Sequence, residues 1–263
     1  MHPRLTVNSL STASWTLEQD LELYDALGVT SAAWYADKLE RAGLGRAVEL
    51  IRDSGIRSAQ VFTRGFTLHD ASTWPGDRDR LRAAIDAATA LDAPWLGLTA
   101  GPAGGLSWDD AAAALGRAVE PLRDLGVGIA VEHSLPIRVE IGFVHSLRDC
   151  MALAERLDLG VTMEGNYCFA ERGLDDTVRG GVDRLAAVQL SDLVTPSTTL
   201  PDRAVPGDGV IDLAALVGLV VDAGYTGQFE LEMLGPRIEA EGYASAVRRA
   251  VDVLEGILEQ VVA

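Results

Sequence analysis

Short apolar stretches alternate with longer segments of helical periodicity along the chain. Val, Ile, Leu and Ala dominate the short stretches, a composition typical of strands buried in a parallel sheet. In the longer segments, apolar positions recur three and four residues apart, as they do on one face of a helix. The alternation occurs eight times, and the predicted strands are residues 5–10, 29–34, 56–62, 94–98, 128–132, 159–163, 185–191 and 227–233.

Helices are predicted between most of these strands. They are clearest at residues 16–28, 45–55, 77–92, 107–126, 145–160 and 240–261. The segment AERGLDDTVRGGVD, after the sixth strand, is shorter and less periodic. Glycines stand where helix C-terminal caps are expected, because glycine tolerates the left-handed backbone conformation of that position. These glycines are Gly28, Gly55, Gly126 and Gly160.

Eight β-then-α units in 263 residues predict an α/β protein with a single (β/α)8 TIM barrel, one domain over residues 1–263. A doubly wound sheet is disfavoured because the chain has no GxGxxG fingerprint. The loop 193–212, rich in Pro, Thr and Gly, follows the seventh strand. In such barrels the loops after the strands build the active site, so we expect this loop at the catalytic rim.

Composition narrows the classes of function. Hydrophobic residues make up 48% of the chain and charged residues 23%, as in an ordinary soluble protein. The sequence shows no secretory leader and no membrane-span pattern, so we expect a cytoplasmic protein without a membrane partner. Its net charge of −17 repels phosphate backbones, so no nucleic-acid partner is expected. Lys38 is the only lysine, which disfavours imine catalysis.

Oxygen-bearing side chains end four predicted strands in the second half of the chain. They are Glu132 in GIAVE, Glu164 in GVTME, Gln189 in AAVQLSD and Glu232 in GQFELEM. The carboxyl ends of neighbouring barrel strands meet at one rim, so these side chains are expected to converge. Three carboxylates close together raise one another's pKa unless a cation neutralises them. The four residues are therefore the predicted ligands of one divalent metal.

The chemistry of these ligands indicates which metal to expect. An all-oxygen set favours Mn²⁺ or Mg²⁺ over zinc, which prefers nitrogen and sulfur ligands, and Co²⁺ is a further option. For each acid taken alone, the alternative is a solvated rim residue or the partner of an arginine.

Over essentially its whole length, the chain resembles the xylose isomerase-like superfamily of sugar isomerases and epimerases. Members carry Glu, Asp, His and Glu ligands at the ends of these same strands, and the substrate completes the coordination. Glu132 matches the first glutamate, and Glu232, five residues after Gly227, matches the last. The resemblance implies a metal-dependent isomerase or epimerase acting on a sugar-like or polyol-like small molecule.

Three positions depart from the pattern of the superfamily. Glu164 stands where the family has Asp, and Gln189 stands where many members have His. Glutamine there resembles the 3-dehydroshikimate dehydratase branch, which is a lyase. Tyr167 stands where that branch and the epimerases usually place a histidine. Other members cleave C-glycosides with a partner subunit, so the resemblance allows a hetero-oligomer as well as a homo-oligomer.

Two further residues are substrate-binding candidates. Arg203 and the PGDG segment at 206–209 resemble the family's arginine and PGxG loop, which implies contact with substrate oxygens. The alternative for Arg203 is an ion pair with Asp202 or Asp208. His133 directly follows Glu132, and packing or support of a ligand is an equal alternative for it.

The predicted reaction is a proton transfer next to a carbonyl group. Either Glu132 or Glu232 removes the proton to form an enediolate, and the other returns it to give an epimer or an isomer. If a hydroxyl or an aglycone leaves instead, the enzyme is a lyase, with Tyr167 as the proton donor. A non-catalytic barrel, acting as a ligand-binding protein or a subunit of a complex, is the alternative from another class.

Overall fold

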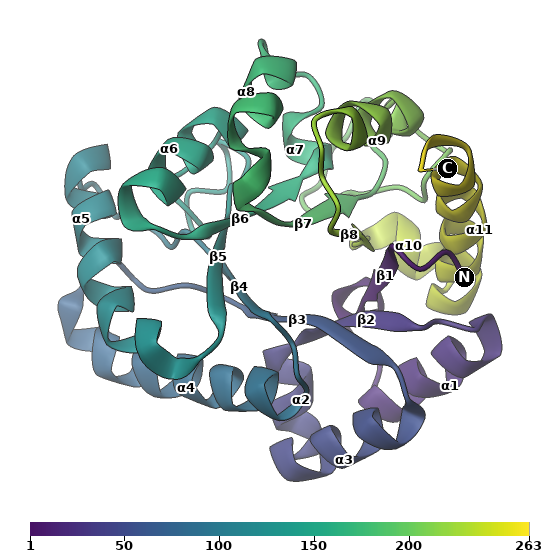
Figure 1. The fold of residues 1–263 in the computed structure, drawn as a ribbon, viewed down its shortest axis with the longest axis horizontal. Helices are drawn as coiled ribbons and strands as arrows, with labels where there is room; N and C mark the ends of the chain where they lie inside the picture. Colours follow the sequence, from purple (N-terminus) through teal and green to yellow (C-terminus); the bar gives the residue numbers. More distant parts are fainter. Residues whose placement is uncertain (263) are drawn as a thin grey trace.

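The computed structural model describes residues 1–262 and confirms the predicted barrel (Figure 1). Within these residues, eight parallel strands follow one another around the barrel, and β1 pairs with β8 to close it. The strands are β1 Leu5–Asn8, β2 Ser31–Tyr35, β3 Arg57–Thr63, β4 Trp95–Thr99, β5 Gly128–Glu132, β6 Gly160–Glu164, β7 Leu185–Leu190 and β8 Gln228–Leu231. The predicted strands are thus all present, with bounds that differ by one or two residues.

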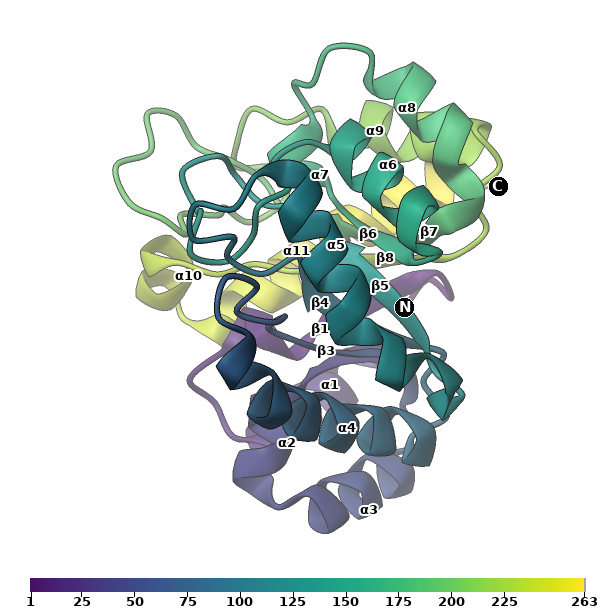
Figure 2. The ribbon, with the colours of Figure 1, turned by 90° about the vertical axis from the view of Figure 1, so that its left-hand side faces the viewer.

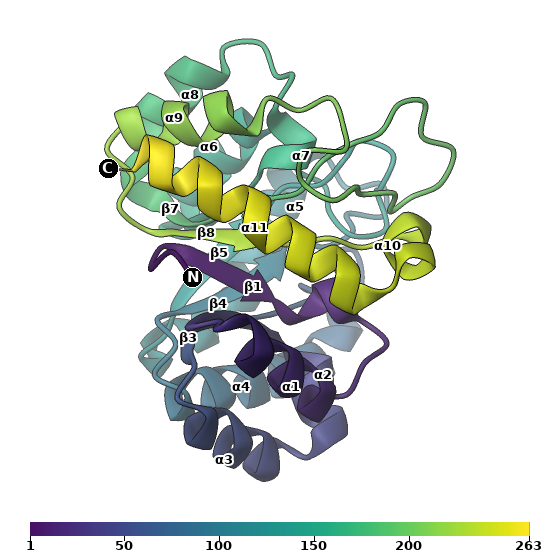
Figure 3. The ribbon, with the colours of Figure 1, turned by 90° about the vertical axis from the view of Figure 1, so that its right-hand side faces the viewer.

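Helices form the outer layer of the barrel (Figure 1). They are α1 Leu17–Leu27, α2 Ala36–Ala42, α3 Leu44–Ser54, α4 Trp74–Ala90, α5 Trp108–Val119, α6 Leu147–Leu157, α7 Gly165–Cys168, α8 Leu174–Gly181, α9 Leu213–Asp222, α10 Pro236–Glu241 and α11 Tyr243–Val261. Helix α11 lies beside β1 on the outside of the barrel (Figure 3). Among the described residues, no helix combines the length and apolar character needed to span a bilayer.

Two local predictions about the helices need correction. Gly160 is not a helix cap: it opens β6, and Asp158 takes the left-handed cap position of α6 with φ 51°. The helix predicted at 240–261 is interrupted at Gly242, whose φ of 94° ends α10 before α11 begins. Caps at Gly28, Gly55 and Gly126 are confirmed by their positive φ angles.

Strand β8 shows how the sequence builds a polar barrel interior. Glu230 hydrogen-bonds to Asn8 and Gln60, which come from β1 and β3, so its side chain points into the barrel. Side chains alternate along a strand, so Phe229 and Leu231 point outward to the helix layer, where both are fully buried. The apolar core therefore lies largely between sheet and helices, and the barrel interior is free to hold polar chemistry.

Loops that follow the strands gather at one end of the barrel, beside α10 (Figure 2). The parallel pairing of every neighbouring strand places all the carboxyl ends at this end. The predicted gathering of strand ends and loops at one rim is therefore confirmed, and it places the ends of β5 to β8 around one opening.

Candidate active site

A cavity of about 270 Å³ opens at the carboxyl end of the barrel. Of the seven site residues predicted from the sequence, five line this cavity: Glu132, Tyr167, Gln189, Arg203 and Glu232. The other two, Glu164 and His133, are buried and do not line it. The strand ends thus converge as predicted, and Arg203 from the loop 193–212 joins them.

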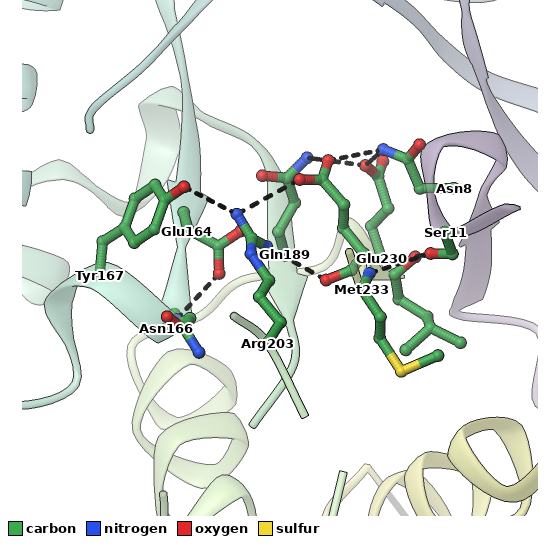
Figure 4. A network of polar contacts seen from close by, with 12 residues as sticks. Asn8, Ser11, Glu164, Asn166, Tyr167, Gln189, Arg203, Glu230 and Met233 are labelled. Carbon is green, nitrogen blue, oxygen red and sulfur yellow. Dashed lines mark hydrogen bonds and ion pairs between the residues drawn. The ribbon is translucent and has the colours of Figure 1, made fainter. Parts of the chain in front are cut away.

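Arg203 lies among the acids, with its side chain almost fully buried (Figure 4). Its Nη1 donates to a carboxylate oxygen of Glu164 and, at 3.1 Å, to the backbone carbonyl of Glu232. Nη2 lies 3.0 Å from the Tyr167 hydroxyl and 3.4 Å from Oε1 of Glu232. The alternative pairings with Asp202 and Asp208 are wrong, since Arg237 and Arg249 pair with those acids.

Asp192 holds the loop that carries Arg203. Its carboxylate accepts hydrogen bonds from the backbone N–H groups of Gly207, Gly209 and Ile211, at 2.9–3.1 Å. A Cβ on Gly209 would lie 2.3 Å from the Asp192 carboxylate, so the close approach requires glycine at this position. The loop is therefore fastened to the end of β7, and the PGDG segment supplies donors to Asp192.

Glu164 and His133 form the layer behind Arg203. Glu164 caps the short helix α7, because its Oε1 accepts the backbone N–H of Asn166 at 2.9 Å. His133 Nε2 accepts the backbone N–H of Glu164 at 3.2 Å, and its ring packs edge-on against Tyr167. In this arrangement His133 supports Glu164 and Tyr167 and does not reach the cavity, so a direct substrate contact does not follow from the structure.

Carboxamide side chains donate hydrogen bonds to Glu230, in β8, and to Glu232, just after the end of that strand (Figure 4). Gln189 Nε2 donates to Glu230 at 2.9 Å and to Glu232 Oε2 at 2.7 Å. Asn8 Nδ2 donates to the same two carboxylates, and Gln60 Nε2 donates to the other oxygen of Glu230. Because carboxylates only accept, the nitrogen of each amide must face them.

Asn8, Gln60 and Glu230 were not among the residues predicted from the sequence. For Glu230 a signal was present: it stands two positions before Glu232, and alternation puts both side chains on the same face of β8. Asn8 and Gln60 gave weaker signals, because a single amide in a strand is common and shows no spacing that marks a site.

Burial and neighbouring charges shift the ionisation of these groups. Burial and the nearby Glu164 raise the pKa of Glu132 to about 8. Burial also raises the pKa of Glu232 well above its usual value, although Arg203 opposes the shift. Burial lowers the pKa of His133 to about 3, so this imidazole is neutral. Burial would lower the pKa of Arg203, but Glu164 and the other acids around it raise that pKa instead.

Comparison with known families decides what this barrel is. The family described as "Xylose isomerase-like TIM barrel" matches residues 21–255. The chain belongs to this family. No curated protein matches the chain.

Solved structures of other xylose isomerase-like proteins share this fold. A protein from Sinorhizobium meliloti 1021 is 23% identical, with 97% of this chain and 98% of that chain covered and a TM-score of 0.86. The IOLI protein with a bound zinc atom is 16% identical, covering 98% and 99% of the two chains, with a TM-score of 0.82. D-psicose 3-epimerase from Clostridium cellulolyticum H10, crystallised with D-tagatose, is 14% identical, covering 98% and 99%, with a TM-score of 0.73.

The donor atoms of this xylose isomerase-like barrel are oxygens that suit a hard cation, although two of the four predicted ligands already have partners. Gln189 Oε1 is buried and has no hydrogen-bond partner. The Glu132 carboxylate lines the cavity and accepts no hydrogen bond from residues 1–262. The amide oxygen of Gln189 and the carboxylate of Glu132 are therefore free to bind a ligand. Arg203 and Asn166 occupy the two oxygens of Glu164. Oε2 of Glu232 accepts from Asn8 and Gln189, and its Oε1 lies 3.4 Å from Arg203 Nη2.

The amide oxygen of Gln189 matters for this fit. Within residues 1–262, no three His, Cys, Asp or Glu side chains are grouped so as to hold a metal. A metal at this rim therefore depends on Gln189 as a ligand beside the glutamates, an oxygen-only set that suits Mg²⁺ or Mn²⁺.

Proposed function

We propose that this xylose isomerase-like barrel is a divalent-metal-dependent isomerase or epimerase of a sugar-like or polyol-like α-hydroxycarbonyl compound. One observation carries the proposal: Glu132 and Glu232 line the same cavity, and Arg203 lines it with them. Two carboxylates and a guanidinium are the groups that an enediolate reaction needs, since carboxylates move the proton and a cation stabilises the developing oxyanion.

Each side chain has a distinct part in this reaction. Glu132, which is free of hydrogen bonds, removes the proton from the carbon next to the carbonyl, and the electron pair of that C–H bond moves toward the carbonyl oxygen. Arg203 donates its terminal N–H groups to that oxygen. Glu232 returns a proton to the opposite face, giving an epimer, or to the neighbouring carbon, giving an isomer.

Glu132, Gln189 and Glu232 are the residues that would hold the metal, Mn²⁺ or Mg²⁺. Glu164, the fourth predicted ligand, joins them only when Arg203 releases its carboxylate. When bound, such a metal supplies positive charge that lowers the energy of the enediolate oxygen.

Exchange of substrate hydrogen with solvent tests this function without knowledge of the product. The purified protein, supplied with Mn²⁺, is mixed in D₂O with fructose, tagatose and other α-hydroxyketones, and proton NMR follows the C–H groups beside the carbonyl. We expect deuterium to enter these positions. Glu132→Gln should abolish exchange because a carboxamide cannot accept the proton, and Glu232→Gln should suppress it because a carboxamide cannot return a proton. Glu155→Gln is the matched control, since Glu155 is exposed on α6 and does not line the cavity.

The same experiment separates the other classes of function. Exchange in wild type and its loss in both variants support the isomerase or epimerase. A ligand that binds without any exchange, in a protein that takes up no metal, would instead indicate a non-catalytic barrel.

A lyase is the second candidate, and one contact favours it. The Tyr167 hydroxyl lines the cavity 3.0 Å from Arg203 Nη2, where it can protonate a departing hydroxyl group. Burial raises the pKa of Tyr167 to about 12, so the phenol keeps its proton at neutral pH. An unsaturated product that appears in wild type and disappears in Tyr167→Phe would establish elimination.

A further inference from the structure

Two arginines stand at the mouth of the cavity, apart from the buried Arg203. Arg64 follows β3, and Arg138 lies in the loop after β5, and both line the cavity that Glu132 and Glu232 line. Neither has a part in the reaction proposed above. In a chain with 39 acidic and 22 basic residues, positive charge gathered at one opening calls for an explanation.

The backbone of Arg64 is held by a hydrogen bond, whereas its guanidinium group has no partner within residues 1–262. Its backbone carbonyl accepts a hydrogen bond from Arg80 Nη1 at 2.7 Å, which holds the loop in place. Within residues 1–262, its side chain makes no hydrogen bond and no ion pair, whereas many other arginines, such as Arg80 and Arg237, pair with a nearby acid. Arg64 therefore presents unused donors at the edge of the cavity.

Only one of the three guanidinium nitrogens of Arg138 has a partner within residues 1–262. Its Nε pairs with the exposed Glu140, and its side chain is 23% exposed. Within the described residues, the two terminal nitrogens of Arg138 have no partner. These N–H groups are available to a ligand that enters the cavity.

The cavity is thus polarised along its depth. Glu132 and Glu232 lie deeper in it together with the buried Arg203, and the more exposed Arg64 and Arg138 lie at its mouth. The hydroxyls of a neutral sugar can accept hydrogen bonds from these guanidinium groups, but a carboxylate adds the attraction between opposite charges and is repelled by the glutamates deeper in the cavity. The charges would therefore hold an acidic substrate in one orientation, with its carbonyl end at the floor.

We propose that Arg64 and Arg138 form a carboxylate subsite, so that the substrate of this barrel is a hydroxy-keto acid whose carboxylate lies at the mouth. The inference rests on the proposed isomerase or epimerase function and adds the class of substrate to it. A planar guanidinium matches a planar carboxylate with two parallel hydrogen bonds. The single lysine is not available for a phosphate, because Lys38 is buried and paired with Asp20.

The test compares three compounds that differ only at carbon 6: D-fructuronate, D-fructose and D-fructose 6-phosphate. Calorimetry measures their binding to the Mn²⁺-supplied protein, and NMR in D₂O measures exchange separately. We expect fructuronate to bind about tenfold or more tightly than fructose, as one or two charge-assisted hydrogen bonds allow. Arg64→Met and Arg138→Met should each reduce that preference, and the double variant should abolish it. Arg82→Met is the control, since Arg82 is exposed on α4 and pairs only loosely with Asp79.

Each result supports or overturns the subsite. Equal binding of the three compounds, no binding of any, or an acid preference that survives in the double variant would overturn it. Tightest binding of the phosphate would overturn its assignment to a carboxylate. Binding of fructuronate that depends on Arg64 but brings no exchange would leave the subsite standing and the proposed isomerase refuted. Exchange of fructose without any acid preference would refute the subsite and leave the proposed isomerase standing.

Discussion

Gln189 donates its amide nitrogen to Glu230 at 2.9 Å, and this contact fixes which end of the amide faces the acids. Its oxygen is thereby turned away from the Glu230 carboxylate (Figure 4). That oxygen is buried without a partner. A glutamine can thus present a pure acceptor toward a ligand, provided that Glu230 and Glu232 hold the other end of its amide.

Replacing Glu230 should therefore weaken metal binding without removing a ligand. In Glu230→Gln, Gln189 Nε2 keeps only Glu232 as an ionised acceptor, and the new amide can donate to Gln189 Oε1 when the Gln189 amide turns over, so the orientation of that amide is held less firmly. We expect Mn²⁺ affinity to fall by about 10- to 100-fold, the usual effect of losing a residue that orients a metal ligand. Titration calorimetry measures the affinity, with Glu155→Gln as the control, because Glu155 is exposed on α6 away from the cavity. An unchanged Mn²⁺ affinity would show that Glu230 does not set the orientation of Gln189.

Arg203 should resist even a conservative substitution. Its guanidinium reaches Glu164, the backbone of Glu232 and the Tyr167 hydroxyl together, which a single ammonium group cannot do. Arg203→Lys should retain the fold, because the buried charge is kept. Its turnover should fall about 100-fold or more, as expected for the loss of an oxyanion donor. Steady-state kinetics measure this fall, and Arg237→Lys in the same region should change turnover little. Wild-type turnover in Arg203→Lys would count against a direct role.

How far the sequence predicts this molecule depends on how local each signal is. The strands could be predicted because a run such as GIAVE is recognisable from its own apolar composition. The barrel could be predicted because eight such strands alternate with helices. Glu132 and Glu232 could be placed at one rim because parallel strands share their polarity. Glu230 could have been predicted as well, because the alternation of side chains along one strand places it on the same face as Glu232.

The pairing of Arg203 with Glu164 could not be predicted in the same way. These residues are 39 positions apart, and their contact depends on how the loop 193–212 folds back over the rim. That path is set by Asp192 and by the backbone donors of Gly207 and Gly209, which form hydrogen bonds only in the folded loop. Loop geometry of this kind has no periodic pattern in the sequence. The sequence therefore indicated only the nearby Asp202 or Asp208 as ion-pair partners of Arg203.

Asp192 should control that loop. Asp192→Asn replaces an acceptor-only group with one that also carries N–H donors, which oppose the backbone N–H groups around it. We expect a loss of about 1.5–3 kcal/mol of folding free energy, typical of hydrogen bonds to a charged group, and faster protease cleavage within residues 193–212. Denaturant unfolding and limited proteolysis measure the two effects. Asp208→Asn is the control, because Asp208 is a half-exposed loop acid paired with Arg249. Equal cleavage in both variants would show that Asp192 does not fasten the loop.

Lys38 and Asp20 provide a test of stability away from the active site. Lys38 lies just after the end of β2, in α2 rather than in a loop, and its Nζ lies 2.6 Å from Asp20 with both side chains buried. Its remaining donors reach the carbonyls of Ser9 and Thr12, so the ammonium group is fully used in structure.

Lys38→Met should therefore destabilise the barrel by about 3–5 kcal/mol, because it leaves the Asp20 carboxylate buried without a cation. Arg46→Met removes an ion pair of similar length, Arg46 with Glu18 at 2.8 Å, but those side chains are 65% and 40% exposed. It should cost no more than about 1 kcal/mol. Urea unfolding of both variants measures the difference, and the double variant Asp20→Asn, Lys38→Met should recover part of the loss. Equal destabilisation by the two single substitutions would mean that burial of the Lys38–Asp20 pair does not decide its contribution.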